Sequence, residues 1–150
     1  EGVIDVVNRF LEIIKPKHIF LGLKDYQQLY LIKKHILKRR IDTKIVECKT
    51  IREKNGVACS SRNFNLNKKD IRIASKIYHY LYKQNKKLNK NYNILKIKNF
   101  KKYIINLGVN KIDYIKYIDT NKFQLAPKSK KKYKIFIAYY LRKTRLIDNI

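Results

Sequence analysis

The stretch HIFLGLKDYQQL, residues 18–29, decides the fold and carries the first candidate site. Residues 18–21 form a short apolar run that stops at Gly22, which is typical of a buried strand. Asp25 lies where an N-cap or first-turn acid is favourable, so a helix is predicted directly after the strand. The apolar face of this helix consists of Leu29, Ile32 and Ile36.

The neighbouring segments extend this pattern to a strand–helix–strand unit. An amphipathic helix is predicted over residues 3–14 and ends at Lys15-Pro16. A second strand is predicted over residues 43–48. The order strand–helix–strand favours parallel strands in an α/β fold. The apolar face of the first helix would contain Val3, Val6, Val7, Phe10, Leu11 and Ile14.

The pattern changes near residue 50, where we place a boundary between an α/β domain and a smaller α+β domain. Asn55-Gly56 predicts a hairpin turn flanked by residues 50–53 and 57–60. Asn67 and Asp70 mark the start of a helix. The remaining predictions are a Lys/Asn-rich loop over 84–91, a helix over 94–106 that stops at Gly108, strands over 111–119 and 133–141, and a basic loop over 127–132.

The net charge of +26, from 37 basic and 11 acidic residues, suggests nucleic acid as a partner. Lys, however, far outnumbers Arg, while Gly, Pro and Trp number only 4, 2 and 0. Codon drift in an A/T-rich genome explains this composition without a ligand and predicts Lys on every exposed face. An evolved nucleic-acid surface would more often concentrate Arg and aromatic residues. We therefore favour drift, with weak polyanion binding as the alternative.

Other global features indicate a cytoplasmic protein. No run of 18 apolar residues is present, so no membrane span is expected. Cys48 and Cys59 have no metal-ligand spacing and are interpreted as reduced thiols. The chain begins with Glu1 inside an amphipathic pattern, so we interpret it as the C-terminal part of a longer polypeptide.

Polar residues after the first predicted strand are suited to a nucleotide. In open α/β sheets, ligands bind beyond the carboxyl ends of strands, against the next helix N-terminus. There Gly22 permits close approach to the backbone, Lys24 can neutralise a phosphate, and Asp25 can accept hydrogen bonds from ribose. Gln28, one turn after Lys24, can bind a polar substrate. A purely structural interpretation, with Asp25 as a cap and Lys24 and Gln28 solvated, stays open for this segment alone.

A second polar cluster, Ser60-Ser61-Arg62-Asn63, precedes the helix that begins near Asn67. Hydroxyls and a guanidinium on such a loop can form a phosphate clamp. A polar loop with Ser-based turns is the simpler interpretation of this cluster alone. The functional interpretation gains weight because both clusters occur in order, separated by a strand and a hairpin.

These stretches resemble the pantoate–β-alanine ligase (pantothenate synthetase) family over essentially the whole chain. The resemblance rests on Gly2-Val3 with Val6-Val7, FLGLKDYQQL at 20–29, IREKNGVACSSRN at 51–63 and TRLIDNI at 144–150. The second and third stretches are specific, and similarity between residues 83 and 134 is weak. The resemblance implies the C-terminal part of a Rossmann-like nucleotide-binding domain at 1–50 and a small α+β lid domain at 51–150.

The resemblance also implies an ATP-dependent ligase. Pantoate attacks the α-phosphorus of ATP, giving pantoyl adenylate and pyrophosphate, and the amine of β-alanine then displaces AMP. Lys24 with Ser60, Ser61 and Arg62 would be the catalytic phosphate contacts, and Gln28 would bind pantoate. A cytoplasmic homodimer and Mg²⁺ are further expectations, with the Mg²⁺ ligands outside this chain. The complete set of implied ATP contacts is Gly22, Leu23, Lys24, Asp25, Ile51, Cys59, Ser60, Ser61 and Arg62.

The chain departs from the family pattern in three ways. Leu23 replaces the usual Glu and Cys59 the usual Leu, which is tolerable where the backbone makes the contact. The family's His-x-Gly-His motif is absent, and His18, His35 and His79 lie in strand or helix patterns that do not replace it. We therefore expect the 150 residues to be inactive alone, with an exposed apolar edge that favours self-association.

Two rival interpretations remain. One is a small basic nucleic-acid-binding module, supported by the charge, the Tyr content and the loop Lys128-Ser129-Lys130-Lys131-Lys132. That loop is equally well explained as a solvated turn. The other is a degenerate remnant that folds without catalysing.

Overall fold

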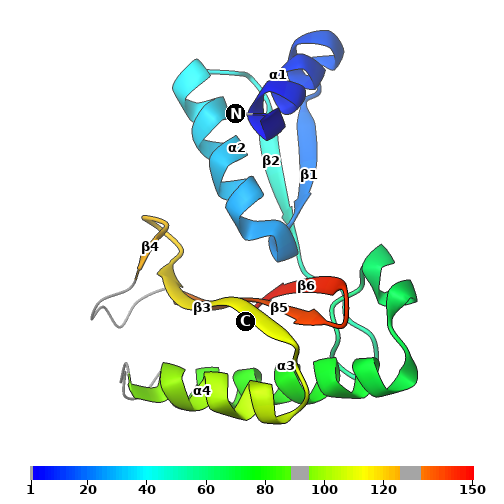
Figure 1. The fold of residues 1–150 in the computed structure, drawn as a ribbon. Helices are drawn as coiled ribbons and strands as arrows, with labels where there is room; N and C mark the ends of the chain where they lie inside the picture. The colour runs from blue at the N-terminus through cyan, green and yellow to red at the C-terminus, as the bar shows by residue number, and fades with distance from the viewer. Residues whose placement is uncertain (1, 89–94, 126–132) are drawn as a thin grey trace. The chain divides into compact units, whose positions relative to one another are not determined.

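The computed structural model describes residues 2–88, 95–125 and 133–150. It divides into two compact units, Glu1–Thr50 and Ile51–Ile150. In Figure 1 the first unit is coloured from blue to cyan, and the second continues through green and yellow to red.

The first unit is a βαβ motif preceded by a helix. Two strands, β1 (His18–Gly22) and β2 (Lys44–Cys48), pair in parallel, with Gly22 opposite Cys48. Their carboxyl ends therefore lie side by side, as the strand–helix–strand order predicts. The helical elements of this unit are α1 (Gly2–Ile14), η1 (Leu23–Asp25) and α2 (Tyr26–Arg39).

Both helices of the first unit pack against one face of the strand pair. Leu11 of α1 is buried together with Ile32 and Ile36 of α2. A hydrogen bond of 2.7 Å between His35 Nε2 and Asn8 Oδ1 joins the two helices. His35 is therefore part of the packing, as the sequence suggests.

The predicted apolar face of α1 is only partly buried, which corrects the expectation of one clean core-facing stripe. Val7 and Leu11 pack into the unit, because they lie on the side of the helix that meets α2 and the strands. Other members of the face are exposed to half or more of their surface. These are Val3, Val6, Phe10 and Ile14.

The second unit combines a four-stranded antiparallel sheet with two long helices. The strand order is β4-β3-β5-β6, and β5 lies in the interior of the sheet. The elements, in chain order, are η2 (Ser61–Asn65), α3 (Lys68–Leu88), α4 (Leu95–Asn106), β3 (Lys111–Asp119), β4 (Gln124–Leu125), β5 (Tyr133–Leu141) and β6 (Thr144–Asn149).

The core of the second unit lies between its sheet and its helices, and α3 and α4 cover the same side of the sheet (Figure 1). β5 is almost continuously buried, as expected for an interior strand with an apolar sequence. The fully buried side chains include Ile77, Leu81, Phe100, Ile104, Ile135, Ile137 and Leu141.

The start of α3 follows the sequence prediction. The backbone N–H of Asp70 donates to Asn67 Oδ1 at 2.8 Å, and the N–H of Asn67 donates to Asp70 Oδ2 at 3.3 Å. This reciprocal pair satisfies N–H groups that the first helical turn leaves without a partner.

One local prediction was wrong, and a second holds in part. The loop predicted over 84–91 is helical up to Leu88, because Gln, Lys and Leu are good helix formers and a solvated helix end needs no apolar face. The turn predicted at Asn55-Gly56 is present, because the N–H of Gly56 donates to the carbonyl of Glu53 at 2.8 Å and Arg52 forms an antiparallel bridge with Ala58. The segments on either side of the turn do not extend into longer strands. The basic loop at 127–132 lies outside the described residues.

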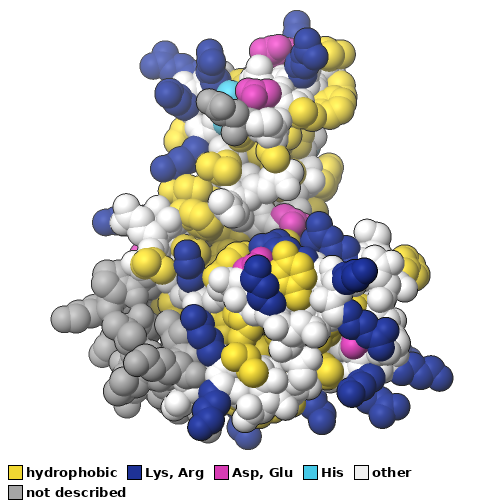
Figure 2. All heavy atoms as spheres, in the orientation of Figure 1, with side chains coloured by type: hydrophobic (Ala, Val, Ile, Leu, Met, Phe, Trp, Pro, Cys, Tyr) yellow, Lys and Arg dark blue, Asp and Glu magenta, His cyan; other side chains and the backbone are white. Residues whose placement is uncertain are grey.

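On the face drawn in Figure 2, basic side chains do not gather on a single patch. Figure 2 shows Lys and Arg scattered over the visible face of both units, as composition drift predicts. Among the residues that the structure describes, no helix is long and apolar enough to cross a membrane. Cys48 and Cys59, both within the described ranges, are not joined in a disulfide.

Candidate functional site

The first group of predicted site residues lies just beyond the carboxyl end of β1. Gly22 ends the strand, Lys24 is half-buried in η1, and Asp25 is exposed at the N-terminus of α2. Gln28 is exposed in the first turn of α2, and Leu23 is half-buried. The structure thus brings these five residues together at one turn.

Asp25 does not cap α2 with its side chain, which corrects the capping prediction. It occupies the N-cap position with φ −94° and ψ 51°, but its carboxylate makes no capping hydrogen bond. These dihedrals lie outside the extended conformation that usually aims an N-cap side chain at the helix. The Asp25 carboxylate therefore does not satisfy the N–H groups of the first turn of α2.

Gly22 leaves open space at the strand end. Its φ is −73°, which any residue adopts, and a Cβ placed there would meet no atom within 4 Å. Neither backbone strain nor packing within the chain therefore requires glycine at this position. The missing side chain leaves the backbone accessible to another molecule.

The second group of predicted residues belongs to the loop before η2. The backbone N–H of Cys59 donates to the carbonyl of Ile51 at 2.9 Å, so these two predicted residues are adjacent. The Ile51 side chain is 75% exposed. This bond uses the backbone N–H of Cys59 and one of the two lone pairs of the Ile51 carbonyl oxygen.

Ser60 and Asn63 organise the turn that presents Arg62. Ser60 Oγ accepts from the N–H of Arg62 at 3.3 Å, which caps η2. Asn63 Nδ2 donates to the carbonyl of Ala58 at 3.0 Å. The Ser-based turn expected from the sequence therefore exists, and it leaves Arg62 and Ser61 exposed.

Arg52 anchors this loop to the last strand. Its guanidinium pairs with both carboxylate oxygens of Asp148, at 2.7 and 2.9 Å, and donates to the carbonyls of Gly56 and Asn149. It also lies 4.3 Å from the centre of the Tyr78 ring. Burial lowers the pKa of Arg52, but the hydrogen bond and charge of Asp148 outweigh it, so the pKa is raised. This contact fixes the segment that leads to residues 59–62.

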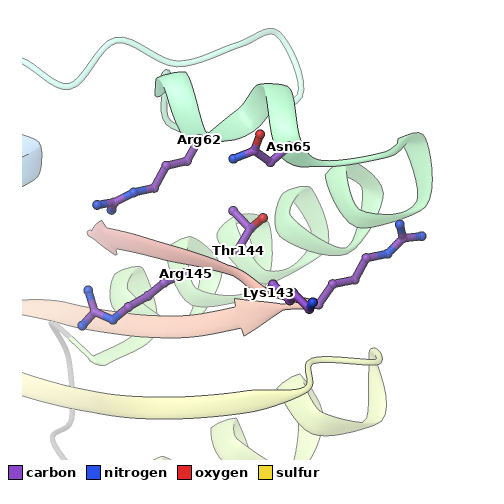
Figure 3. Close-up of a pocket in the computed structure, with 6 residues that line it drawn as sticks. Arg62, Asn65, Lys143, Thr144 and Arg145 are labelled. Atoms are coloured by element: carbon purple, nitrogen blue, oxygen red, sulfur yellow. The ribbon is translucent and has the colours of Figure 1, made fainter.

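A shallow, open pocket of about 630 Å³ lies beside η2. Figure 3 shows Arg62 entering from η2 and Arg145 from β6, with both guanidinium groups pointing to the same side. None of the described residues that line it is acidic, and a cluster of this kind is suited to an anion. The lining residues are Arg62, Asn65, Arg142, Lys143, Thr144 and Arg145.

Two of the pocket cations are held by carboxylates. Arg145 Nε donates to Asp113 Oδ2 at 2.7 Å, and this hydrogen bond raises the pKa of Arg145. Asp113 lies where the β3–β5 register shifts, and such an irregularity re-aims a side chain. Arg142 Nε lies 3.3 Å from Oδ2 of the buried Asp70. These ion pairs set the walls of the pocket.

Among the predicted site residues only Arg62 lines this pocket, and Cys59, Ser60 and Ser61 do not. The sequence reasoning assigned no role to Arg142, Lys143 or Arg145. The sequence does contain a signal for these residues. The basic run 142–145 follows an apolar strand and overlaps the start of the stretch 144–150, on which the family resemblance rests.

Together these features define an α/β protein whose second unit carries a cationic pocket suited to a phosphate-bearing ligand. The family model described as pantoate-beta-alanine ligase matches residues 1–150. The chain belongs to this family. It is 35% identical over 150 residues to a pantothenate synthetase of Thermosipho melanesiensis, covering 99% of this chain and 54% of that protein.

A second curated relative is the pantothenate synthetase of Francisella tularensis subsp. mediasiatica. It is 38% identical over 148 residues, which are 99% of this chain and 48% of that protein. The chain therefore spans about half the length of the curated relatives it matches. Nothing in these comparisons supports the nucleic-acid-binding alternative.

Solved structures agree with the fold. Pantothenate synthetase from Thermus thermophilus matches with a TM-score of 0.89 at 23% identity, over 99% of this chain and 54% of that chain. Pantoate-beta-alanine ligase from Francisella tularensis, complexed with beta-gamma ATP and beta-alanine, matches with a TM-score of 0.75 at 37% identity, over 99% and 49%. The predicted α/β fold class is confirmed.

Proposed function

We propose that this chain forms the part of a pantoate–β-alanine ligase that binds ATP and pantoate. The observation that carries the proposal is the likeness to the Francisella tularensis ligase, whose structure contains beta-gamma ATP and beta-alanine. In this proposal residues 1–50 are the end of a nucleotide-binding domain and residues 51–150 are a lid domain.

The reaction begins with the carboxylate of pantoate attacking the α-phosphorus of ATP. An O–P bond forms and pyrophosphate leaves, giving pantoyl adenylate. The amine of β-alanine then attacks the acyl carbon, AMP leaves, and the nitrogen loses a proton as the amide forms. Both steps move negative charge on phosphates, so fixed cations and hydrogen-bond donors can lower the barriers.

The residues at the end of β1 have the chemistry for the adenylation step. Lys24 would neutralise the phosphates, and Asp25, whose carboxylate does not cap α2, would accept from ribose. Gln28 is exposed in the first turn of α2 and would hold pantoate. Open space at Gly22 would admit the nucleotide close to the backbone.

The second unit would supply the remaining phosphate contacts. Arg62 enters a pocket lined by further cations, and the hydroxyls of Ser60 and Ser61 can donate to phosphate oxygens. Ser60 Oγ accepts from the backbone in the present geometry, which leaves its O–H available to donate. Ile51 and Cys59, joined by a backbone hydrogen bond, would contact the nucleotide through the main chain.

We assign no metal-binding role to this chain. Within the described ranges, no three His, Cys, Asp or Glu side chains gather where they could hold a metal ion. Magnesium, a homodimeric assembly and a cytoplasmic location remain part of the proposal on the basis of family membership.

Replacing Lys24 with Ala in the full-length gene product tests the proposal. Pyrophosphate release from ATP and pantoate should fall about a hundred-fold or more, because a preorganised contact to developing phosphate charge is lost. Lys38→Ala, which removes the same charge from the other end of α2, is the control and should change the rate less than about two-fold. Normal adenylation by Lys24→Ala would contradict the assigned role.

A further inference from the structure

The turn between β5 and β6 is rigidly attached to its surroundings. Leu141 pairs with Thr144, so residues 142 and 143 form a two-residue hairpin turn. Arg142 has φ 53°, its backbone N–H donates to Asn110 Oδ1, and its guanidinium faces Asp70. These two contacts of Arg142, one from its backbone and one from its side chain, hold the backbone next to Lys143.

Lys143 is one of two pocket cations whose charge is not neutralised. Arg142 and Arg145 each have a carboxylate partner. In the part of the chain that the structure describes, no ion pair holds the side chain of Arg62 or of Lys143. Both residues line the same pocket, and two positive charges without a carboxylate partner there favour an anion that carries more than one charge.

The other side chains that line the pocket are of types that can bind a diphosphate. Thr144 and Asn65 offer a hydroxyl and an amide as neutral donors. Arg62 can form a two-pronged contact with one phosphate, while Lys143 can act as a point charge on the next. A volume of about 630 Å³ lies in the range of small-molecule sites, so a diphosphate fits with room for a larger attached group.

We propose that Lys143, at the β5–β6 turn, is a phosphate-binding residue that holds a diphosphate group together with Arg62. The inference rests on the proposed function, in which this group occurs twice: as the β- and γ-phosphates of ATP and as released pyrophosphate. Lys143 and Arg62 belong to the same unit, so the site is built by the second unit itself.

Titration calorimetry of the 150-residue chain with inorganic pyrophosphate tests this inference. Lys143→Gln and Arg62→Gln should each weaken binding about ten-fold, the size of one charge-assisted contact. Lys76→Gln removes the same charge from an exposed position of α3 outside the pocket and should change affinity less than about two-fold. AMP, which lacks a diphosphate, should bind with no dependence on Lys143.

A β,γ-methylene ATP analogue distinguishes the source of the diphosphate. If Lys143→Gln weakens the binding of both the analogue and pyrophosphate, the pocket binds the β- and γ-phosphates of ATP. If Lys143→Gln weakens the binding of pyrophosphate alone, the pocket binds the released product. Either result supports the inference.

Equal weakening by Lys143→Gln and Lys76→Gln, or the absence of saturable pyrophosphate binding, would overturn it. Ligase activity of the full-length gene product, measured in parallel, separates this failure from that of the proposed function. If the full-length gene product has ligase activity but Lys143→Gln does not weaken pyrophosphate binding, only the diphosphate site is rejected. If Lys143→Gln weakens pyrophosphate binding but the full-length gene product has no ligase activity, only the proposed reaction is rejected.

Discussion

The ion pair of Arg52 and Asp148 should be a main source of stability in the second unit. Its two hydrogen bonds measure 2.7 and 2.9 Å, and the side chains are only 19% and 13% exposed. Arg52→Met would remove these bonds and those to the carbonyls of Gly56 and Asn149. The change would leave Asp148 poorly solvated and without its cation.

The cost follows from the geometry. Removing one partner of a buried ion pair costs about 3–5 kcal/mol. Residual exposure, and the hydrogen bond that Asp148 Oδ1 keeps from the N–H of Asn149, place the estimate at the lower end, about 3 kcal/mol. That is a large fraction of the typical stability of a domain, about 5–15 kcal/mol.

Urea unfolding of the chain, followed by tyrosine near-ultraviolet circular dichroism, measures the effect because most tyrosines lie in the second unit. With a slope of about 1.5 kcal/mol per molar urea, the midpoint should fall by about 2 M. Lys33→Met breaks the exposed pair with Glu47 and should cost about 0.5 kcal/mol or less.

A double variant isolates the pair itself. Arg52→Met with Asp148→Leu should be more stable than Arg52→Met alone, because no unpaired charge stays buried. A midpoint for Arg52→Met within error of the Lys33→Met control would refute the reasoning.

Two other predictions concern single positions in the second unit. Gly56 has φ +87°, and a Cβ there would lie 2.2 Å from the Tyr78 ring, so Gly56→Ala should cost about 2–3 kcal/mol. Gly22→Ala, with ordinary φ and no atom within 4 Å, should leave urea stability unchanged, and equal costs would contradict this account. Burial, and secondarily the charge of Asp148, raises the pKa of Tyr139. In the unfolded chain the tyrosine pKa is about 10, so the Tyr139 hydroxyl loses its proton at a lower pH in the unfolded chain than in the folded one. Stability should therefore fall above about pH 10, by up to about 1.4 kcal/mol per pH unit from this group. Tyr139→Phe should reduce that slope, and an unchanged slope would show that Tyr139 is not its source.

The sequence predicted helices and strands correctly where the spacing of apolar residues and the residues at the ends of an element indicate the same structure. The apolar run 18–21 ending at Gly22 became β1, and the Asn67–Asp70 pair became the start of α3. The length of α3 was underestimated because a polar run was taken for a loop, although its residues favour helix.

The pocket and the Arg52 anchor could not be predicted from local patterns. Arg52 and Asp148 lie 96 residues apart, and only the path of the chain through the sheet brings them together. Arg62 and Arg145 line one pocket for the same reason, because η2 lies beside β6. Composition could not show which of many basic residues lack a carboxylate partner.

The central proposal is that Lys24 and Arg62 each bind phosphate groups of ATP. A crystal structure of the full-length gene product with a non-hydrolysable ATP analogue tests it most directly. We predict Lys24 Nζ and the Arg62 guanidinium within about 3 Å of oxygens of the same triphosphate. A well-ordered triphosphate that contacts neither side chain, or only one of them, would contradict the account.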